Sequence, residues 1–313
     1  MKRILLPHLI CPTCLPKEYP LQPSITKELD GEIETGLLTC PRCRQDFPVQ
    51  DGIANLVSNP DSATSGGQWR YEDQEMTARY LWSQYGDLLG EQTGEDGEIG
   101  WGGLLAQSGA AAFEAGCAVG RLTFEMANRF GFSVGCDLSS SFIKTARRLA
   151  RNRELSFSLP LEGNLTEAFN LQLPVSWQTG NVEFIVADAL RLPVAANSFD
   201  QVVSLNLLDR VSYPLAHLYE MNRVSANQNS SFLFADPFSW STSAAPEERW
   251  LGGTSQGPYS GRGLDNVRAL LEGKNRVLIP AWKISWSGSR TWRMRTHRNH
   301  YEVISSDYLI AAR

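Results

Sequence analysis

The sequence lacks long apolar runs, a cleavable leader and a strong excess of charge. Its longest hydrophobic stretches are far too short to cross a bilayer, so we expect no membrane partner. The N-terminus carries two positive charges but no extended apolar core and no small-residue cleavage site, which predicts a cytoplasmic location. A net charge of -5 over 313 residues does not favour a broad nucleic-acid-binding surface. The length fits one large domain and one small domain.

Cysteine is also scarce, and most of it lies in two short motifs. Of six cysteines, four form the pairs Cys11/Cys14 and Cys40/Cys43, with 25 residues between the pairs. Without a secretion signal, paired CxxC motifs indicate a metal site more often than a disulfide. Four thiolates suit a closed structural zinc site, and they have no histidine or spare ligand of the kind a catalytic zinc needs. The alternatives are a redox-active cysteine pair and a former zinc-binding domain that no longer holds the metal.

A central stretch, residues 110–143, has the pattern of a strand, a tight turn, a helix and a second strand. The first strand leads into Glu114, glycines 116 and 120 form the turn, and the second strand ends at Asp137. This order predicts the first half of a nucleotide-binding βαβ unit. Asp137 lies 21 residues after Gly116, where such folds place a carboxylate that accepts ribose hydroxyls.

The turn differs from a dinucleotide-binding fingerprint. Cys117 stands where the middle glycine of G-x-G-x-x-G would lie, so close approach of a diphosphate is disfavoured. Glu114 beside the turn favours a cationic group, such as an ammonium or a sulfonium. An ordinary strand-to-helix turn is the alternative. Cys117 and Cys136 are expected to be buried thiols in the sheet.

Further strands are expected to end at the same edge of the sheet. Asp188 and Ala189 follow one apolar run, and Asn206 ends the next. Ligands bind outside the carboxyl ends of strands in open α/β sheets, so these residues are candidates for ligand contact. The predicted strands are residues 182–187, 201–206, 231–235, 277–286 and 301–312, the last two as an antiparallel pair.

Two motifs resemble those of class I S-adenosylmethionine-dependent methyltransferases. They are E-x-G-x-x-x-G over residues 114–120 and D-A-x-x-L-P-x-x-x-x-S-F-D-x-V over residues 188–202. The resemblance implies an α/β fold with a Rossmann-like sheet and S-adenosylmethionine as cofactor. It also implies that Asp188 meets the adenine amino group and that the Ala189 amide meets a ring nitrogen. The residues expected to bind the cofactor are Glu114, Gly116, Cys117, Gly120, Asp137, Leu138, Asp188, Ala189 and Asn206.

The cysteine-rich segment resembles a second family. L-I-C-P-x-C over residues 9–14 and C-P-x-C-x-x-x-F-P-V-x-D-G-I over residues 40–53 are similar to the small zinc-ribbon protein that activates tRNA, rRNA and release-factor methyltransferases. In that family the ribbon is usually a separate subunit, whereas here it is fused to the enzyme. The predicted organisation is a small N-terminal four-cysteine zinc ribbon at 1–58, a linker with a cofactor-capping helix at 59–104, and a methyltransferase domain at 105–313.

Several pieces also resemble the methyltransferase module of ovothiol biosynthesis enzymes, which methylates an imidazole. They are G-C-A-V-G-R at 116–121, N-L-x-D-R-V at 206–211, D-P-F-S-W at 236–240 and E-R-W-L-G-G at 248–253. This resemblance implies a small acceptor with an imidazole or a thiol. It departs at 154–180, which is predicted to be an insertion containing a hairpin.

Polar residues after the fourth and fifth strands and near the C-terminus are the candidates for acceptor binding and proton removal. The Asp209–Arg210 pair could instead be a salt bridge, and the histidines and tryptophans could be surface and core residues. The catalytic candidates are Asp209, Tyr213, Asp236 and His297, with Trp240 and His300 as further acceptor-binding candidates.

Basic residues recur on the helix that follows Asp137. Lys144, Arg147, Arg148 and Arg151 lie on one side of it, and we expect a solvated face rather than a nucleic-acid groove. Residues 69–89 are predicted to form a helix that either caps the cofactor pocket or simply packs, followed by a loop at 90–103 near the active site.

Methyl transfer to a small nitrogen or sulfur acceptor is the expected function. Methylation of tRNA, rRNA or a protein is the first alternative, which the ribbon favours. Nucleic acid is nevertheless not the favoured partner, because no N-P-P-Y-like element follows residue 205. A non-catalytic protein that binds S-adenosylmethionine is the second alternative, and the oligomeric state is left open.

Overall fold

The computed structural model describes residues 1–58, 70–91, 100–274 and 276–313. The first part of the predicted linker segment at 59–104 lies outside these residues, and so does most of the predicted loop at 90–103. No helix in the described ranges is long and apolar enough to cross a membrane.

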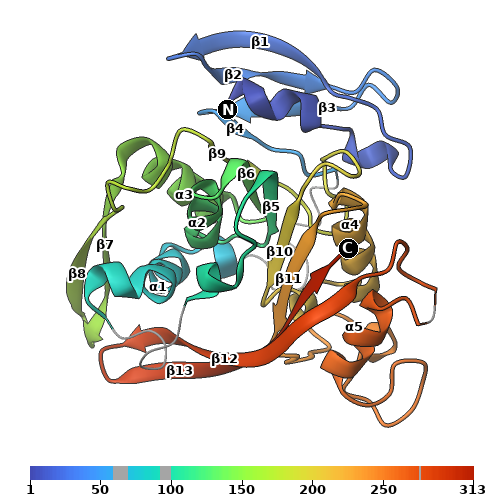
Figure 1. The fold of residues 1–313 in the computed structure, drawn as a ribbon. Coiled ribbons are helices and arrows are strands. Elements are labelled where there is room, and N and C mark those ends of the chain that lie inside the picture. The colour runs from blue at the N-terminus through green and yellow to red at the C-terminus, as the bar shows by residue number, and fades with distance from the viewer. Residues whose placement is uncertain (59–69, 92–99, 275) are drawn as a thin grey trace.

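The N-terminal segment folds into a four-stranded antiparallel ribbon (Figure 1). Phe47 and Val49 are buried while their neighbours are exposed, the two-residue period of a half-buried strand. Two 3₁₀ helices, Arg3–His8 and Pro12–Cys14, precede the strands, and the second carries the first CxxC motif. The strands, in chain order and in sheet order, are β1 (Gln22–Leu29), β2 (Glu32–Thr39), β3 (Asp46–Gln50) and β4 (Ile53–Ala54).

A seven-stranded sheet forms the centre of the rest of the chain. The strand order is β12-β13-β11-β10-β5-β6-β9, and β13 runs against its neighbours. The direction of strand succession reverses between β5 and β10, which is where open α/β sheets bind ligands. The strands are β5 (Gly109–Ala115), β6 (Phe130–Asp137), β9 (Val182–Val186), β10 (Gln201–Leu205), β11 (Ser231–Asp236), β12 (Lys283–His297) and β13 (His300–Ala312).

Helices cover both faces of this sheet. The first three pack in a cluster that contains Phe124, Phe142 and Phe184, and the last two pack on the other face through Leu218 and Val267. The predicted α/β fold with a Rossmann-like sheet is therefore confirmed. The helices are α1 (Gln74–Tyr85), α2 (Arg121–Ala127), α3 (Ser140–Asn152), α4 (Pro214–Val224) and α5 (Gly263–Leu271).

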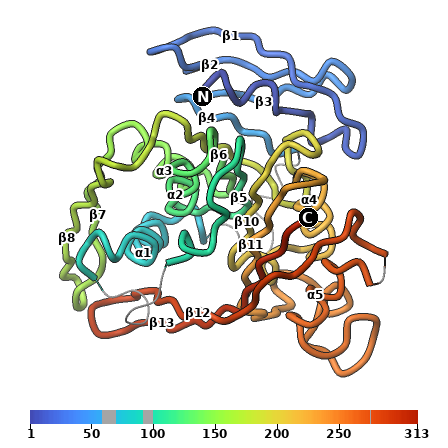
Figure 2. Tube along the Cα trace, viewed as in Figure 1, coloured from blue at the N-terminus to red at the C-terminus, as the bar shows by residue number. Residues whose placement is uncertain are grey.

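The ribbon packs against the connection between β9 and β10. That connection, residues 187–200, is fully described and contains no helix. The Leu56 N–H donates to the Val186 carbonyl (2.8 Å) and the Ile10 N–H donates to the Pro193 carbonyl (2.9 Å). Figure 2 shows the blue ribbon beside the β6 and β9 edge of the sheet. The ribbon therefore covers the face that a crossover helix covers in other βαβ units.

One arginine of α3 lies in the contact with the ribbon. Arg147 is 3% exposed and pairs with Glu183 of β9 and with Glu32 of β2, whose Oε2 lies 2.5 Å from its Nη2. Arg151 pairs with Glu34 of the same ribbon strand. The predicted solvated face is therefore wrong for Arg147, because the ribbon covers it.

Two hairpins extend beyond the sheet (Figure 1). β7 (Glu154–Glu162) and β8 (Leu165–Gln172) form the hairpin predicted in the insertion. The predicted C-terminal antiparallel pair is also confirmed, but β12 continues eleven residues past the predicted end at 286, to His297. The far end of this pair contacts α1 and the β7–β8 hairpin: the rings of Trp82 and Tyr301 are 5.5 Å apart, and Arg295 and Glu167 form a 2.6 Å ion pair.

Candidate functional site

A cleft of about 1260 Å³ opens along the carboxyl ends of β5, β6, β9 and β10. Acidic side chains lie at three of these ends, so the acidic groups of the cleft are concentrated where the strands converge. Such a concentration favours a cationic ligand. The predicted cofactor residues that line the described part of the cleft are Glu114, Gly116, Asp137, Leu138, Asp188, Ala189 and Asn206.

The turn after β5 depends on two glycines. Gly116 and Gly120 have φ angles of +73° and +87°, a region that residues with a side chain rarely adopt. A Cβ at Gly116 would lie 3.0 Å from Leu207, and one at Gly120 would lie 2.6 Å from Phe184. Gly116 therefore keeps the cleft open beside the turn. Gly120 and the buried Cys117 belong to the turn but are not among the described lining residues of the cleft.

Two backbone amides hold Asp137 at the end of β6. The Ala118 N–H donates to its Oδ2 (3.0 Å) and the Ser139 N–H donates to its Oδ1 (2.9 Å). Burial raises the pKa of Asp137 to about 6, against the opposing effect of these hydrogen bonds. The group is therefore mostly a carboxylate at neutral pH, and its oxygens have further lone pairs for ligand hydroxyls.

Glu114 lies deeper, with 3% of its surface exposed. The Thr123 hydroxyl of α2 donates to its Oε2. Burial raises the pKa of Glu114 to about 8, so the carboxyl group keeps its proton in much of the free protein at neutral pH. A ligand cation in the cleft would favour the ionised form, because opposite charges stabilise each other.

Asp188 and Ala189 form a tight loop after β9. The Leu190 N–H donates to Asp188 Oδ1 (2.9 Å). His217 of α4 supports this loop from behind: its Nδ1 lies 3.2 Å from the Ala189 carbonyl and its Nε2 lies 2.8 Å from Ser204 Oγ. Burial lowers the pKa of His217 to about 4, so the ring is neutral and bridges the two strands. Sequence reasoning missed His217, since one histidine on a helix gives no signal of such a contact.

The segment leading into α1 closes one side of the cleft. The Glu72 carboxylate accepts from the N–H groups of Ser140 (2.8 Å) and Ser141 (3.1 Å), at the first turn of α3. The Tyr80 ring lies 4.8 Å from the Phe142 ring, and both residues line the cleft. Residues of α1 therefore line the described cleft and also pack against α3, and its role as a cap over the cofactor stays a prediction.

The β12–β13 hairpin closes the opposite side. Its residues alternate between two faces, as in any strand, and one face lines the cleft. Trp101, in the 3₁₀ helix Trp101–Leu104, meets this face, with its ring centre 5.7 Å from the Arg290 guanidinium carbon. Sequence reasoning missed this wall. The lining residues of the face are Arg290, Trp292, Met294, Glu302 and Ile304.

Asp209 and Asp236 lie behind the cleft wall. Asp236 Oδ2 accepts from the Asp209 N–H (3.3 Å), and Asp209 Oδ2 accepts from the Ser239 N–H (2.8 Å). Asp209 also forms a salt bridge with Arg210 (3.2 Å), which the sequence offered as the alternative to a catalytic role. Burial raises the pKa of Asp209, and burial together with the Asp209 charge raises that of Asp236. In the described part of the cleft, Arg210 and Ser239 are lining residues and the two aspartates are not.

The other acceptor candidates also lie outside the described cleft lining. Tyr213 is 49% exposed, with the Arg249 guanidinium 3.8 Å from its ring centre. His297 and His300 face each other at the turn of the β12–β13 hairpin, with ring centres 5.6 Å apart. Trp240 stacks on a neighbouring tryptophan ring. The structure does not bring the four catalytic candidates together in the cleft, and their roles stay predictions.

The four ribbon cysteines form a compact cluster. All four sulfur atoms lie within 4.8 Å of one another. The Cys11 and Cys43 sulfurs are 3.6 Å apart, and those of Cys14 and Cys40 are 3.8 Å apart. A tetrahedral zinc with bonds of about 2.3 Å separates its sulfur ligands by about 3.8 Å. The cluster therefore fits the predicted structural zinc.

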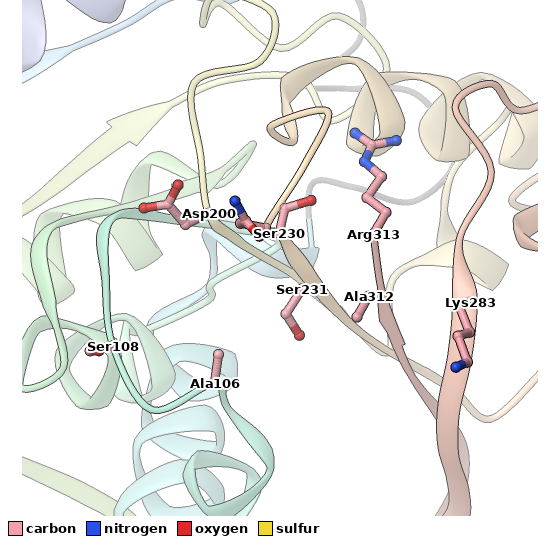
Figure 3. Close-up of a pocket in the computed structure, with 9 residues that line it drawn as sticks. Ala106, Ser108, Asp200, Ser230, Ser231, Lys283, Ala312 and Arg313 are labelled. Atoms are coloured by element: carbon pink, nitrogen blue, oxygen red, sulfur yellow. The ribbon is translucent and has the colours of Figure 1, made fainter.

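A second cavity, of about 440 Å³, lies at the amino ends of the strands (Figure 3). Two of its charged groups, Asp200 and Arg313, have structural partners. Asp200 Oδ2 accepts from the Ala110 N–H (2.6 Å), and the Arg313 guanidinium donates to Asn222 Oδ1 (2.7 Å). These groups hold the ends of the chain and of β10 in place, and we assign no ligand to this cavity.

Comparisons with known proteins agree with this geometry. Residues 113–229 match the family described as methyltransferase domain, and residues 2–52 match the family described as Trm112p-like protein. The chain therefore carries an S-adenosylmethionine-dependent methyltransferase domain of class I. More particularly, it is a fusion of that enzyme domain with a Trm112p-like zinc ribbon. The carboxylates at the strand ends and the space kept by Gly116 fit the cofactor. The resemblance to the ovothiol module stays a prediction.

Several solved structures are similar to this chain. An S-adenosylmethionine-dependent methyltransferase from Methanosarcina mazei is 17% identical, with 67% of this chain and 94% of that chain covered and a TM-score of 0.42. Magnesium protoporphyrin IX methyltransferase from Synechocystis, with bound S-adenosylmethionine, is 17% identical, with 77% and 97% covered and a TM-score of 0.38. No curated protein matches the chain.

Proposed function

We propose that this protein transfers the methyl group of S-adenosylmethionine to a nitrogen or sulfur atom of a small molecule in a reducing cytoplasm. The enclosure of the cleft supports this proposal most: α1 closes one side, and the β12–β13 hairpin closes the other. A volume of about 1260 Å³ exceeds the roughly 300–1,000 Å³ of a pocket for one small ligand. The cleft therefore has room for the cofactor and a second small molecule.

The three strand-end carboxylates are assigned to the cofactor. Asp137 would accept hydrogen bonds from the ribose hydroxyls, Asp188 would accept one from the adenine amino group, and Glu114 would pair with the ammonium of the methionine part. Bound S-adenosylmethionine supplies a methyl group on a positively charged sulfur. The glycine turn and the Asp188–Ala189 loop fix the direction from which that methyl group can be approached.

The remaining cleft residues hold the acceptor in line and exclude water. The acceptor lone pair forms the new bond to carbon, while the carbon–sulfur bond breaks and its electron pair stays on sulfur. A thiolate acceptor needs no base, whereas a nitrogen acceptor with a hydrogen loses a proton after transfer. An imidazole or thiol acceptor therefore fits a cleft whose catalytic candidates Asp209, Tyr213, Asp236 and His297 lie outside the described lining.

Methylation of RNA or protein is the second candidate, and the match to the Trm112p-like family favours it. One experiment separates the two. The purified protein is incubated with methyl-labelled S-adenosylmethionine and, separately, with the RNA, protein and small-molecule fractions of a cell extract. We expect label in the small-molecule fraction, and none with the Asp137→Ala variant. Label confined to RNA or protein would contradict the proposal. We also propose that the domain boundaries lie at residues 58 and 104, as the sequence predicts.

A further inference from the structure

A threonine of α2 reaches one of the acidic side chains that line the cleft. Thr123 is fully buried, and its hydroxyl donates to Glu114 Oε2. Gly135 of β6 lies beside Glu114 of β5 in the sheet, and a Cβ at this glycine would lie 2.6 Å from Thr123 Oγ1. The missing side chain at Gly135 therefore makes room for the Thr123 hydroxyl beside Glu114.

The described titratable side chains that face Glu114 from the neighbouring elements are neutral or acidic. Burial raises the pKa values of the tyrosine and of both thiols in this set, so these three groups are neutral, and the two carboxyl groups oppose a charge on Glu114. Arg121 of α2 already pairs with Asp87 and with Glu125. A ligand cation would therefore supply the missing positive charge. The titratable groups are Tyr85 on α1, Cys117 in the glycine turn, Glu125 on α2, and Cys136 and Asp137 on β6.

A hydroxyl suits a carboxyl group that changes its ionisation. It has one proton to donate and two lone pairs to accept, so Thr123 can bond to both forms of Glu114. The hydrogen bond to the carboxylate is the stronger one, because hydrogen bonds to charged groups exceed those between neutral groups. Thr123 therefore favours the ionised form, against the burial that raises the pKa of Glu114 to about 8. The Thr123 backbone N–H acts in the same direction.

We propose, resting on the proposed function, that Thr123 is a positioning residue that prepares Glu114 for the ammonium group of the cofactor. Its hydroxyl holds one carboxyl oxygen toward α2 and leaves the other for the ligand. Entry of the cation displaces the proton of Glu114, which passes through the cleft to solvent, and only this O–H bond breaks. Thr123 acts through Glu114 and lies outside the described lining of the cleft.

Titration with S-adenosylhomocysteine between about pH 6 and 9 tests this role, since that ligand carries the same ammonium group. Thr123→Val removes the hydroxyl at nearly the same volume and keeps the backbone N–H. We expect the pH at which the affinity levels off to move up by about one to two units, because a hydrogen bond to a charged group is lost. At about pH 7 the variant should bind roughly tenfold to 100-fold more weakly, and the difference should narrow as the pH rises.

Two further variants separate this role from a purely structural one. Thr123→Ser keeps the hydroxyl and should restore the pH profile of the unmodified protein. Thr145→Val makes the same substitution in α3, where the hydroxyl donates to the Ser141 carbonyl (2.9 Å), and it should leave the profile unchanged. A Thr123→Val protein whose profile does not move, or whose affinity is weakened equally at every pH, would overturn the proposal.

Proton release gives a second measurement, on the unmodified protein. Calorimetry in two buffers with different heats of ionisation counts the protons exchanged when S-adenosylhomocysteine binds. At about pH 7 we expect about one proton to be released per bound ligand, because Glu114 is mostly protonated in the free protein. Binding without proton release would contradict the proposal. If the unmodified protein binds no S-adenosylhomocysteine at any pH, the proposed function itself fails, and that outcome is distinct from binding that ignores pH.

Discussion

Replacing Arg147 with methionine tests whether the ribbon and the methyltransferase domain unfold together. The guanidinium lies between Glu183, which is fully buried, and Glu32 of the ribbon, and it is itself 3% exposed. Without it, the buried Glu183 loses its ion-pair partner and Glu32 loses its partner across the contact. Removing one partner of a buried ion pair costs roughly 3–5 kcal/mol, so we expect the free energy of unfolding to fall by about that amount.

The neighbouring arginine provides a matched control. Arg148 is exposed on the same helix, so Arg148→Met should change the free energy of unfolding by less than about 0.5 kcal/mol. A double variant, Arg147→Met with Glu183→Gln, should recover much of the loss, because it removes the unpaired charge. The glutamine also keeps an oxygen for the Lys2 N–H, which donates to Glu183.

Urea unfolding with two probes gives the measurement. All nine tryptophans lie after residue 58, so their fluorescence follows the enzyme domain, while zinc release to a colorimetric chelator follows the ribbon. We expect the two transitions to coincide and to move together in Arg147→Met. The reasoning is refuted if Arg147→Met is as stable as Arg148→Met, or if zinc leaves well before the fluorescence changes.

Further variants test separate parts of the account. Cys40→Ser should lose the zinc, measured by metal analysis, whereas Cys117→Ser should keep it because that thiol lies outside the cluster. Gly116→Val should weaken S-adenosylhomocysteine binding at least about tenfold by calorimetry, because its Cβ would lie 3.0 Å from Leu207 in a left-handed backbone. Cofactor affinity should rise with pH toward about 8 and then level off, since Glu114 has a pKa of about 8 and pairs with an ammonium only when ionised. Because this pKa is raised from 4.5, Glu114 also makes the protein less stable as pH rises from about 4.5 to 8, and Glu114→Gln should remove both trends.

The cofactor end of the cleft could be predicted because its residues follow local rules. Glu114, Asp137 and Asp188 each follow an apolar run directly, so a strand assignment alone places them at one edge of the sheet. The zinc cluster is predictable for the same reason, since two CxxC motifs each fix two ligands. In both cases the pattern of neighbouring residues in the sequence was enough to predict the site.

The acceptor end could not be predicted, because it depends on contacts between distant segments. Residues 287–297 have the pattern of a basic strand, and contacts with distant segments, such as the Arg295–Glu167 ion pair, hold this hairpin beside the cleft. The sequence around Arg147 has the pattern of an exposed helix face, whereas in the structure the ribbon covers this residue. Asp209 and Asp236 follow strand ends as catalytic carboxylates often do, yet they bond to the backbone of each other's loops.

Titration of the unmodified protein and of Asp137→Ala with S-adenosylhomocysteine tests the central claim most directly. The account predicts one site per chain in the unmodified protein. It also predicts about tenfold to 100-fold weaker binding in the variant, because hydrogen bonds to a charged group are worth roughly 1.5–3 kcal/mol. No heat from the unmodified protein at high ligand excess, or equal affinity in the variant, would contradict it.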